Sequence, residues 1–419
     1  MIEYERFRLG NGLTVLVTED WSTPLVTLNL LCGVGARDER EGLTGFAHLF
    51  EHLMFGGTPR VPSYDREVEQ MGGESNAFTN NDYTNFYITV PATMVERAMW
   101  LEADRLRGLD WSEGVLEVQK KVVTEEYRQR YENQPYGDLW LLLRPLCFRE
   151  SAYSWCTIGK DIRDVSTAKM EDVRVFHDRF YGPENMILAV AGGVKAEEVR
   201  RLAEKHFGDL APHGKIEGGV AAERRQYRRE PLQKEARRLE VEREVPENVF
   251  LKAYPMAGKR ERDFVVWDLL SDVLSNGKSS RMYIDLVKEN PLFTELSAFV
   301  SGEYGEGLFV VKGMLNEDVA FEAAERGVEE QLERLRNEEL AARELEKVVD
   351  KYEATFAFSH YKASEKAANL CYYEWMGKTE WVNSEPEEYR KVTTSDLQRV
   401  AREGLAEERS NTIYYKKKS

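Results

Sequence analysis

The sequence predicts an α+β protein built from two similar domains. The chain has 419 residues, 42% of them hydrophobic, so it can bury more than one core. Short apolar stretches typical of strands alternate with longer stretches of helical periodicity. A segment poor in large apolar residues, 212–235, separates two halves that repeat one another in outline. We therefore expect domains at residues 1–214 and 236–419, joined by a linker at residues 215–235.

The first half begins with two strands that lead into a short apolar helix. Residues 25–31 alternate in part and lie between Pro24 and Gly33, which are typical strand boundaries. A polar turn at residues 80–82 separates two further strand-like segments, which predicts a β-hairpin. The elements expected here are strands at 13–17, 25–31, 74–79, 84–90 and 186–191, and helices at 45–55, 64–71, 93–107, 113–131, 170–180 and 196–206.

The second half shows a similar order of strands and helices. We expect strands at 249–254 and 308–313, helices at 263–274 and 317–335, and a last strand near residues 414–415. The strand at 308–313 ends at a glycine and precedes a helix, as the strand at 186–191 does. We therefore expect these two strand–helix pairs to be counterparts in a duplicated fold.

The helix at 45–55 carries the motif His48-Leu49-Phe50-Glu51-His52. Its two histidines are four residues apart, which places both imidazoles on one helix face, one turn apart. Such a pair can bind one divalent metal ion, and Glu51 could accept a proton from water at that ion. This is the inverted form of the H-E-x-x-H zinc motif. The second half contains no such motif, so we expect one zinc ion per chain.

A zinc site with two histidines needs a third protein ligand and leaves its fourth position to water. The helix at 113–131 carries Glu125 and Glu126, and one of the two is our candidate. Paired glutamates on a helix more often form a solvated surface, so their spacing alone does not choose between them.

Charge and composition exclude several classes of partner. The formal net charge is −16, which argues against nucleic acid or an anionic membrane as a general partner. The first residues contain no basic and apolar leader, and no stretch approaches 18 uninterrupted apolar residues. We therefore expect a cytoplasmic protein, unless a presequence has been removed. The four cysteines lack C-x-x-C spacing, so neither a disulfide framework nor a thiolate zinc site is indicated.

Four segments in this order resemble the insulinase-like (pitrilysin) family of zinc peptidases: Asn11-Gly12-Leu13, the run from Gly45 to Thr58, the run Gly72-Gly73-Glu74-Ser75-Asn76-Ala77-Phe78-Thr79, and Val122-Val123-Thr124-Glu125-Glu126. The resemblance implies that His48 and His52 bind zinc, that Glu51 is the general base, and that Glu126 is the third ligand. Glu125 would then lie on the helix surface. Family members usually have an acidic residue seven positions before the third ligand, and this chain has Gln119 there, which could loosen the orientation of the ligands.

The resemblance also implies a fold and a substrate class. Family domains are mostly antiparallel sheets covered by helices, and subunits normally pair into a closed chamber that admits unfolded peptides. An edge strand beside the zinc pairs with the substrate backbone, and Asn76, Ala77, Phe78 and Thr79 occupy the matching segment. The expected function is therefore a zinc-dependent endopeptidase acting on extended peptides. The alternatives are a non-catalytic scaffold or core-type subunit of a larger complex, and a regulatory metal-binding module.

One departure from the family concerns the second half. After the loop at residues 275–283, active members usually carry an arginine and, seven residues later, a tyrosine, which contact the substrate at the zinc site. The corresponding residues here are Val287 and Thr294. Neither can supply those interactions, so we expect a dimer, preferably a heterodimer with a homologous subunit that lacks the zinc motif. A homodimer is the alternative.

Overall fold

The computed structural model describes residues 1–214 and 227–418, and these form two compact units. Unit 1 comprises residues 1–129, 155–227 and 357–384, and unit 2 comprises residues 130–154, 228–356 and 385–419. Each unit therefore contains segments from both halves of the sequence, whereas the expected domains divide the chain once, at the linker. Residues 215–226 of that expected linker lie outside the described residues.

Unit 1 contains a six-stranded sheet in the order β1-β2-β6-β3-β5-β4. Strands β2 and β6 are parallel, and every other neighbouring pair is antiparallel. Strand β6 is apolar and buried along its whole length, and β3 is buried except at Leu25, its first residue. The strands are β1 (Glu5–Arg8), β2 (Thr14–Glu19), β3 (Leu25–Cys32), β4 (Glu74–Thr79), β5 (Thr84–Pro91) and β6 (Met186–Gly192).

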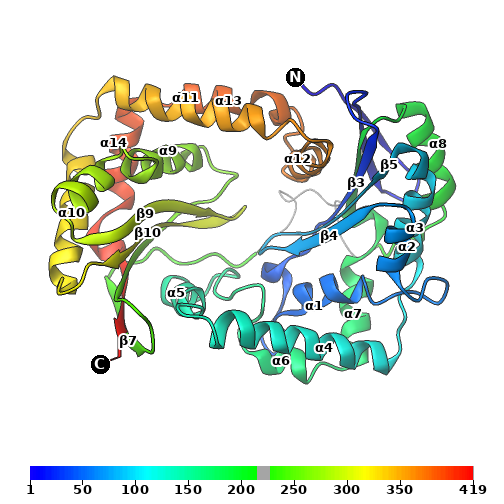
Figure 1. Cartoon of the computed structure of the whole chain (residues 1–419), viewed down its shortest axis with the longest axis horizontal. Helices are drawn as coiled ribbons and strands as arrows, with labels where there is room; N and C mark the ends of the chain where they lie inside the picture. The colour runs from blue at the N-terminus through cyan, green and yellow to red at the C-terminus, as the bar shows by residue number, and fades with distance from the viewer. Residues whose placement is uncertain (215–226, 419) are drawn as a thin grey trace. The chain divides into compact units, whose positions relative to one another are not determined.

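Helices cover this sheet. Figure 1 shows α12 on one side of β3 and β5, and α3 and α8 on the other. Helix α12 comes from the C-terminal part of the chain, and the Cys371 thiol on it donates a hydrogen bond to the Asn29 carbonyl of β3, 3.3 Å away. The helices of unit 1 are α1 (Phe46–Leu53), α2 (Tyr64–Gln70), α3 (Val95–Arg107), α4 (Glu113–Tyr127), α6 (Ile162–Ser166), α7 (Met170–Phe180), α8 (Ala196–Phe207) and α12 (Ala363–Trp375).

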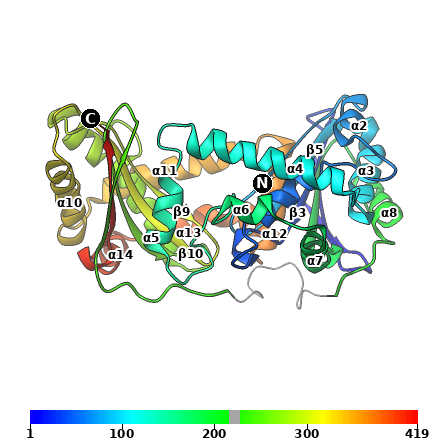
Figure 2. The same cartoon turned by 90° about the horizontal axis from the view of Figure 1, so that it is seen from below.

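Unit 2 contains a five-stranded sheet in the order β7-β11-β8-β10-β9. Its core lies between the sheet and helices α9, α10 and α14, and Figure 2 shows α5 and α10 on opposite sides of the strands. The elements are β7 (Arg237–Arg243), β8 (Val249–Ala257), β9 (Phe293–Gly302), β10 (Glu306–Leu315), β11 (Asn411–Lys417), α5 (Leu139–Cys147), α9 (Asp263–Ser275), α10 (Phe321–Asn337) and α14 (Thr394–Gly404). Helices α11 (Ala342–Phe358) and α13 (Trp381–Arg390) each begin in one unit and end in the other.

The two sheets share one topology. The order β2-β6-β3-β5-β4 of unit 1 matches β7-β11-β8-β10-β9 of unit 2, with the same parallel and antiparallel neighbours. The α+β fold with two similar, mostly antiparallel domains is therefore confirmed. The expected counterpart of β6 was wrong: β10 occupies the position of β5, and β11 occupies that of β6. Strand–glycine–helix order is local, whereas sheet position depends on pairing between distant segments.

No helix among the described residues is long and apolar enough to cross a lipid bilayer. The four cysteines are free thiols and are all buried.

Candidate metal centre

Helix α1 is positioned by buried contacts along its length and by hydrogen bonds at its first turn. Phe46, Leu49 and Phe50 are fully buried. Gly45 precedes the helix with φ of 80°, and a Cβ there would lie 2.7 Å from the Ile158 carbonyl oxygen, so only glycine fits. These constraints fix the direction in which the helix presents its histidines.

The carboxyl group of Glu39, a partly buried residue, satisfies the amide groups at the start of α1. It accepts hydrogen bonds from the amides of Gly45 and Ala47 and from the Trp155 indole, each at 2.9 Å. Burial raises the pKa of Glu39 to about 8, although these donors favour its ionised form. Neither role can be identified from the sequence, because the Trp155 indole lies 116 residues from Glu39 and no local pattern links it to the helix.

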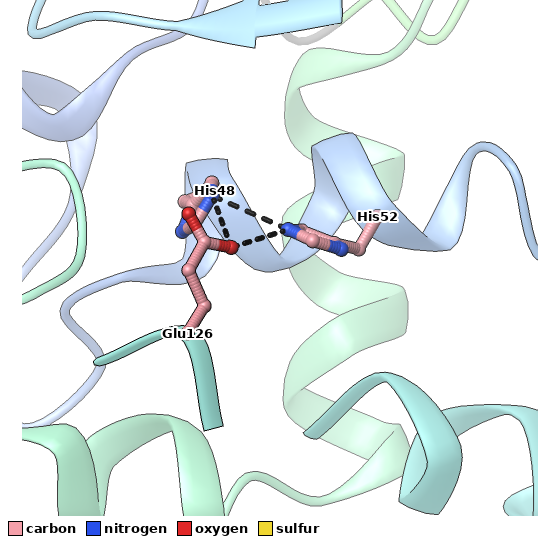
Figure 3. Close-up of side chains that lie close together, drawn as sticks. All are labelled: His48, His52 and Glu126. Carbon is pink, nitrogen blue, oxygen red and sulfur yellow. Dashed lines mark hydrogen bonds and ion pairs between the residues drawn. The ribbon is translucent and has the colours of Figure 1, made fainter. Parts of the chain in front are cut away.

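Helix α4 supplies the third side chain of the centre. It packs against α1, and Ser112 caps its N-terminus, since the Ser112 hydroxyl accepts a hydrogen bond from the Val115 amide at 3.4 Å. Near its C-terminal end the Glu126 side chain is 17% exposed and points toward the two histidines, as Figure 3 shows. The Glu125 side chain is 54% exposed and lies 3.4 Å from the Arg128 guanidinium. Helical geometry turns adjacent residues to different faces, so only Glu126 lies at the centre.

The described residues bring together a group of three potential metal ligands, namely His48, His52 and Glu126. The two Nε2 atoms are 3.3 Å apart, and Glu126 Oε2 is 3.6 Å from Nε2 of His48 and 3.3 Å from Nε2 of His52 (Figure 3). Bonds of roughly 2.0–2.2 Å to a tetrahedral zinc ion place ligand atoms about 3.3–3.6 Å apart. The donor set and its spacing therefore fit a zinc ion with three protein ligands.

Glu51 lies on α1 between the two histidines, and its carboxylate is held by strand β4. The Thr79 hydroxyl donates a hydrogen bond to Glu51 Oε2 at 2.7 Å. The same hydroxyl oxygen is 3.4 Å from the Thr84 hydroxyl oxygen across the hairpin. Thr79 was expected to contact substrate, and in the structure its side chain contacts the expected general base.

The predicted substrate strand corresponds to β4, which is the edge strand of the sheet and pairs only with β5 among the described residues. Its side chains alternate, with Asn76 and Phe78 exposed and Ala77 and Thr79 partly buried. The Phe78 ring lies 5.9 Å from the Tyr83 ring. An edge strand next to the metal centre leaves backbone groups available to an extended peptide.

The remaining residues singled out from the sequence lie outside this constellation. Gln119, on α4, is partly exposed, and its side chain makes no hydrogen bond with the described residues. In unit 2, Val287 packs against the hydrophobic core. Thr294 is exposed on β9, and its hydroxyl donates a hydrogen bond to the Met314 carbonyl at 3.3 Å. Neither position offers a guanidinium or a phenol.

Comparisons with known proteins identify the relatives of this chain. The family model "Insulinase (Peptidase family M16)" matches residues 14–141, and the model "Peptidase M16 inactive domain" matches residues 167–352. The zinc protease PqqE of Helicobacter pylori is 28% identical, over 99% of this chain and 93% of its own length. The uncharacterized zinc protease YmxG of Bacillus subtilis is 23% identical, over 86% of each chain. A solved structure of a protease from Helicobacter pylori superposes with a TM-score of 0.91 at 28% identity, covering 99% of this chain and 100% of that one.

Proposed function

Because the chain belongs to the insulinase family of peptidases, we propose that it is a zinc-dependent endopeptidase that hydrolyses extended peptides or unfolded segments. The observation that carries this proposal is the spacing of the nitrogen and oxygen atoms of His48, His52 and Glu126, with the Glu51 carboxylate on the same helix as the histidines. The names of the relatives, which are zinc proteases, support the same class of reaction.

The roles of the residues follow from their chemistry. A zinc ion bound by the two histidines and Glu126 would polarise the scissile carbonyl and make water acidic enough to lose a proton near neutral pH. The Glu51 carboxylate accepts that proton and returns it to the leaving amine. The Thr79 hydroxyl donates a hydrogen bond to one oxygen of Glu51 and so helps to orient the carboxylate that takes up the proton. The edge of β4 that has no partner strand among the described residues pairs with the substrate backbone, which favours extended peptides over folded proteins.

The experiment that tests this function combines zinc analysis with hydrolysis of a quenched peptide. The Glu51→Gln variant should retain zinc and lose hydrolysis, because an amide of similar shape cannot accept a proton at neutral pH. Full activity in that variant would refute the mechanism, and loss of zinc would assign Glu51 a ligand or folding role. A native chain that binds zinc without turnover would favour the regulatory metal-binding module, and one that does neither would favour the scaffold.

We further propose that the active form is a dimer that encloses a chamber, preferably a heterodimer. The support is chemical: Val287 and Thr294 cannot replace the arginine and tyrosine that active relatives use. The purified chain should therefore be weakly active alone and be stimulated by a homologous subunit that lacks the zinc motif and keeps that pair. A fully active homodimer that such a homologue neither binds nor stimulates would contradict the proposal.

A further inference from the structure

Unit 2 contains a cavity of about 240 Å³ between helix α5 and one face of its sheet. Its apolar walls include Trp140 and Leu143 of α5, Leu251 of β8 and Phe299 of β9. The Trp140 and Phe299 rings lie 6.3 Å apart. The volume is many times the roughly 15 Å³ that one water molecule needs, so the cavity can admit a large apolar side chain.

One cation lies among these apolar side chains. Lys312 of β10 lines the cavity, and its cross-strand neighbours are Leu251 and Ser297, which also line it. The Lys312 side chain is partly buried, and no carboxylate of the described residues lies within 4.0 Å of its ammonium group. In a chain with a net charge of −16, a lysine without an acidic partner is free to pair with an anion from outside.

Two hydrogen bonds hold Tyr136 at the rim of the cavity. Tyr136 has φ of 63°, a conformation that a residue with a large side chain rarely adopts. Its hydroxyl donates a hydrogen bond to the Glu247 carbonyl at 3.0 Å and accepts one from the Glu247 amide at 3.1 Å. Such backbone conformations persist where the surroundings enforce them, and they concentrate at ligand-binding sites.

We propose that this cavity binds the C-terminal residue of a peptide substrate, with an apolar or aromatic side chain against Trp140 and Phe299 and its terminal carboxylate paired with Lys312. This inference rests on the proposed peptidase function. It adds recognition of the C-terminal residue of the substrate, a feature that the metal centre does not bind. A terminal residue carries the apolar group and the carboxylate together. In an extended peptide, an acidic side chain next to an apolar one points to the opposite face, so an internal acidic residue fits this cavity less well.

The first test compares peptides on the full chain carrying Glu51→Gln, which prevents turnover. Fluorescence anisotropy measures the Kd of three labelled peptides: one ending in phenylalanine with a free carboxylate, the same peptide amidated, and an amidated peptide with an internal glutamate. The free acid should bind about tenfold or more tightly than the amide, because a charge-assisted hydrogen bond is lost on amidation. Equal affinity of the free acid and the amide would overturn the proposal. Selective binding of the internal-glutamate peptide would overturn the C-terminal assignment.

The second test uses variants in the same background. Lys312→Met should weaken binding of the free acid about tenfold and leave the amide unchanged, whereas Trp140→Ala should weaken both. The matched control is Lys288→Met, which removes the same charge from an exposed position of unit 2 outside the cavity. Equal effects of Lys312→Met and Lys288→Met would overturn the site. Carboxylate-selective binding in a chain that never hydrolyses peptides would refute only the proposed function, and hydrolysis without that selectivity would refute only this inference.

Discussion

Replacing Thr79 by valine tests whether the hairpin positions the general base. Valine keeps the β-branched shape that suits a strand and removes only the hydroxyl. That hydroxyl donates the 2.7 Å hydrogen bond to Glu51 Oε2. A hydrogen bond to a charged group is worth about 1.5–3 kcal/mol. If this contact orients the carboxylate in the transition state, kcat should fall roughly 10- to 100-fold.

The assay is steady-state hydrolysis of a quenched peptide, with zinc content and thermal unfolding measured in parallel. We expect kcat to fall, KM to change little and zinc to be retained, with activity restored by Thr79→Ser. Thr89→Val is the matched control, because it removes a hydroxyl that pairs with Thr27 at 2.9 Å in the same sheet. In the Glu51→Gln background, Thr79→Val should have no further effect on the residual rate. An unchanged kcat would refute the positioning role, and a change confined to KM would show that Thr79 binds substrate instead.

Three further predictions concern the metal ligands and the stability of each unit. Glu126→Gln should lose zinc during dialysis against a mild chelator while Glu125→Gln retains it; greater loss at Glu125 would move the ligand by one residue. Asp268→Asn should stabilise the protein by up to about 3 kcal/mol at pH 8 and little at pH 4. Burial raises the pKa of Asp268 from 3.8 to about 6, so the native protein loses stability as the pH rises through that range, and the asparagine variant does not. Urea unfolding that shows the same pH slope in both proteins would contradict this. Glu39→Ala should lower the free energy of unfolding by about 2–4 kcal/mol and weaken zinc retention, since it leaves buried amide donors at the start of α1 unpaired. The control Glu41→Ala changes an exposed residue and should leave the free energy of unfolding almost unchanged in the same assay.

The sequence by itself determined the features that depend on local periodicity. The spacing of His48 and His52 puts both on one face of a helix, and that holds in α1. The turn at residues 80–82 correctly predicts the hairpin of β4 and β5. The helical stretch expected at 113–131 contains α4, which ends at Tyr127, followed by a π-helical turn at Arg128–Glu132. These elements follow from hydrogen bonds and side-chain spacing within a few residues, so the local pattern suffices.

Tertiary structure alone decided which distant residues meet. Spacing left Glu125 and Glu126 equivalent, and the packing of α4 against α1 turns only Glu126 to the histidines. No local sequence pattern predicts three further features either: the capping of α1 by Glu39, the contact between Thr79 and Glu51, and the position of β11 between β7 and β8. Each depends on how the whole chain buries its apolar surface, because the same strand or helix pattern is compatible with several neighbours, and long-range packing selects among them.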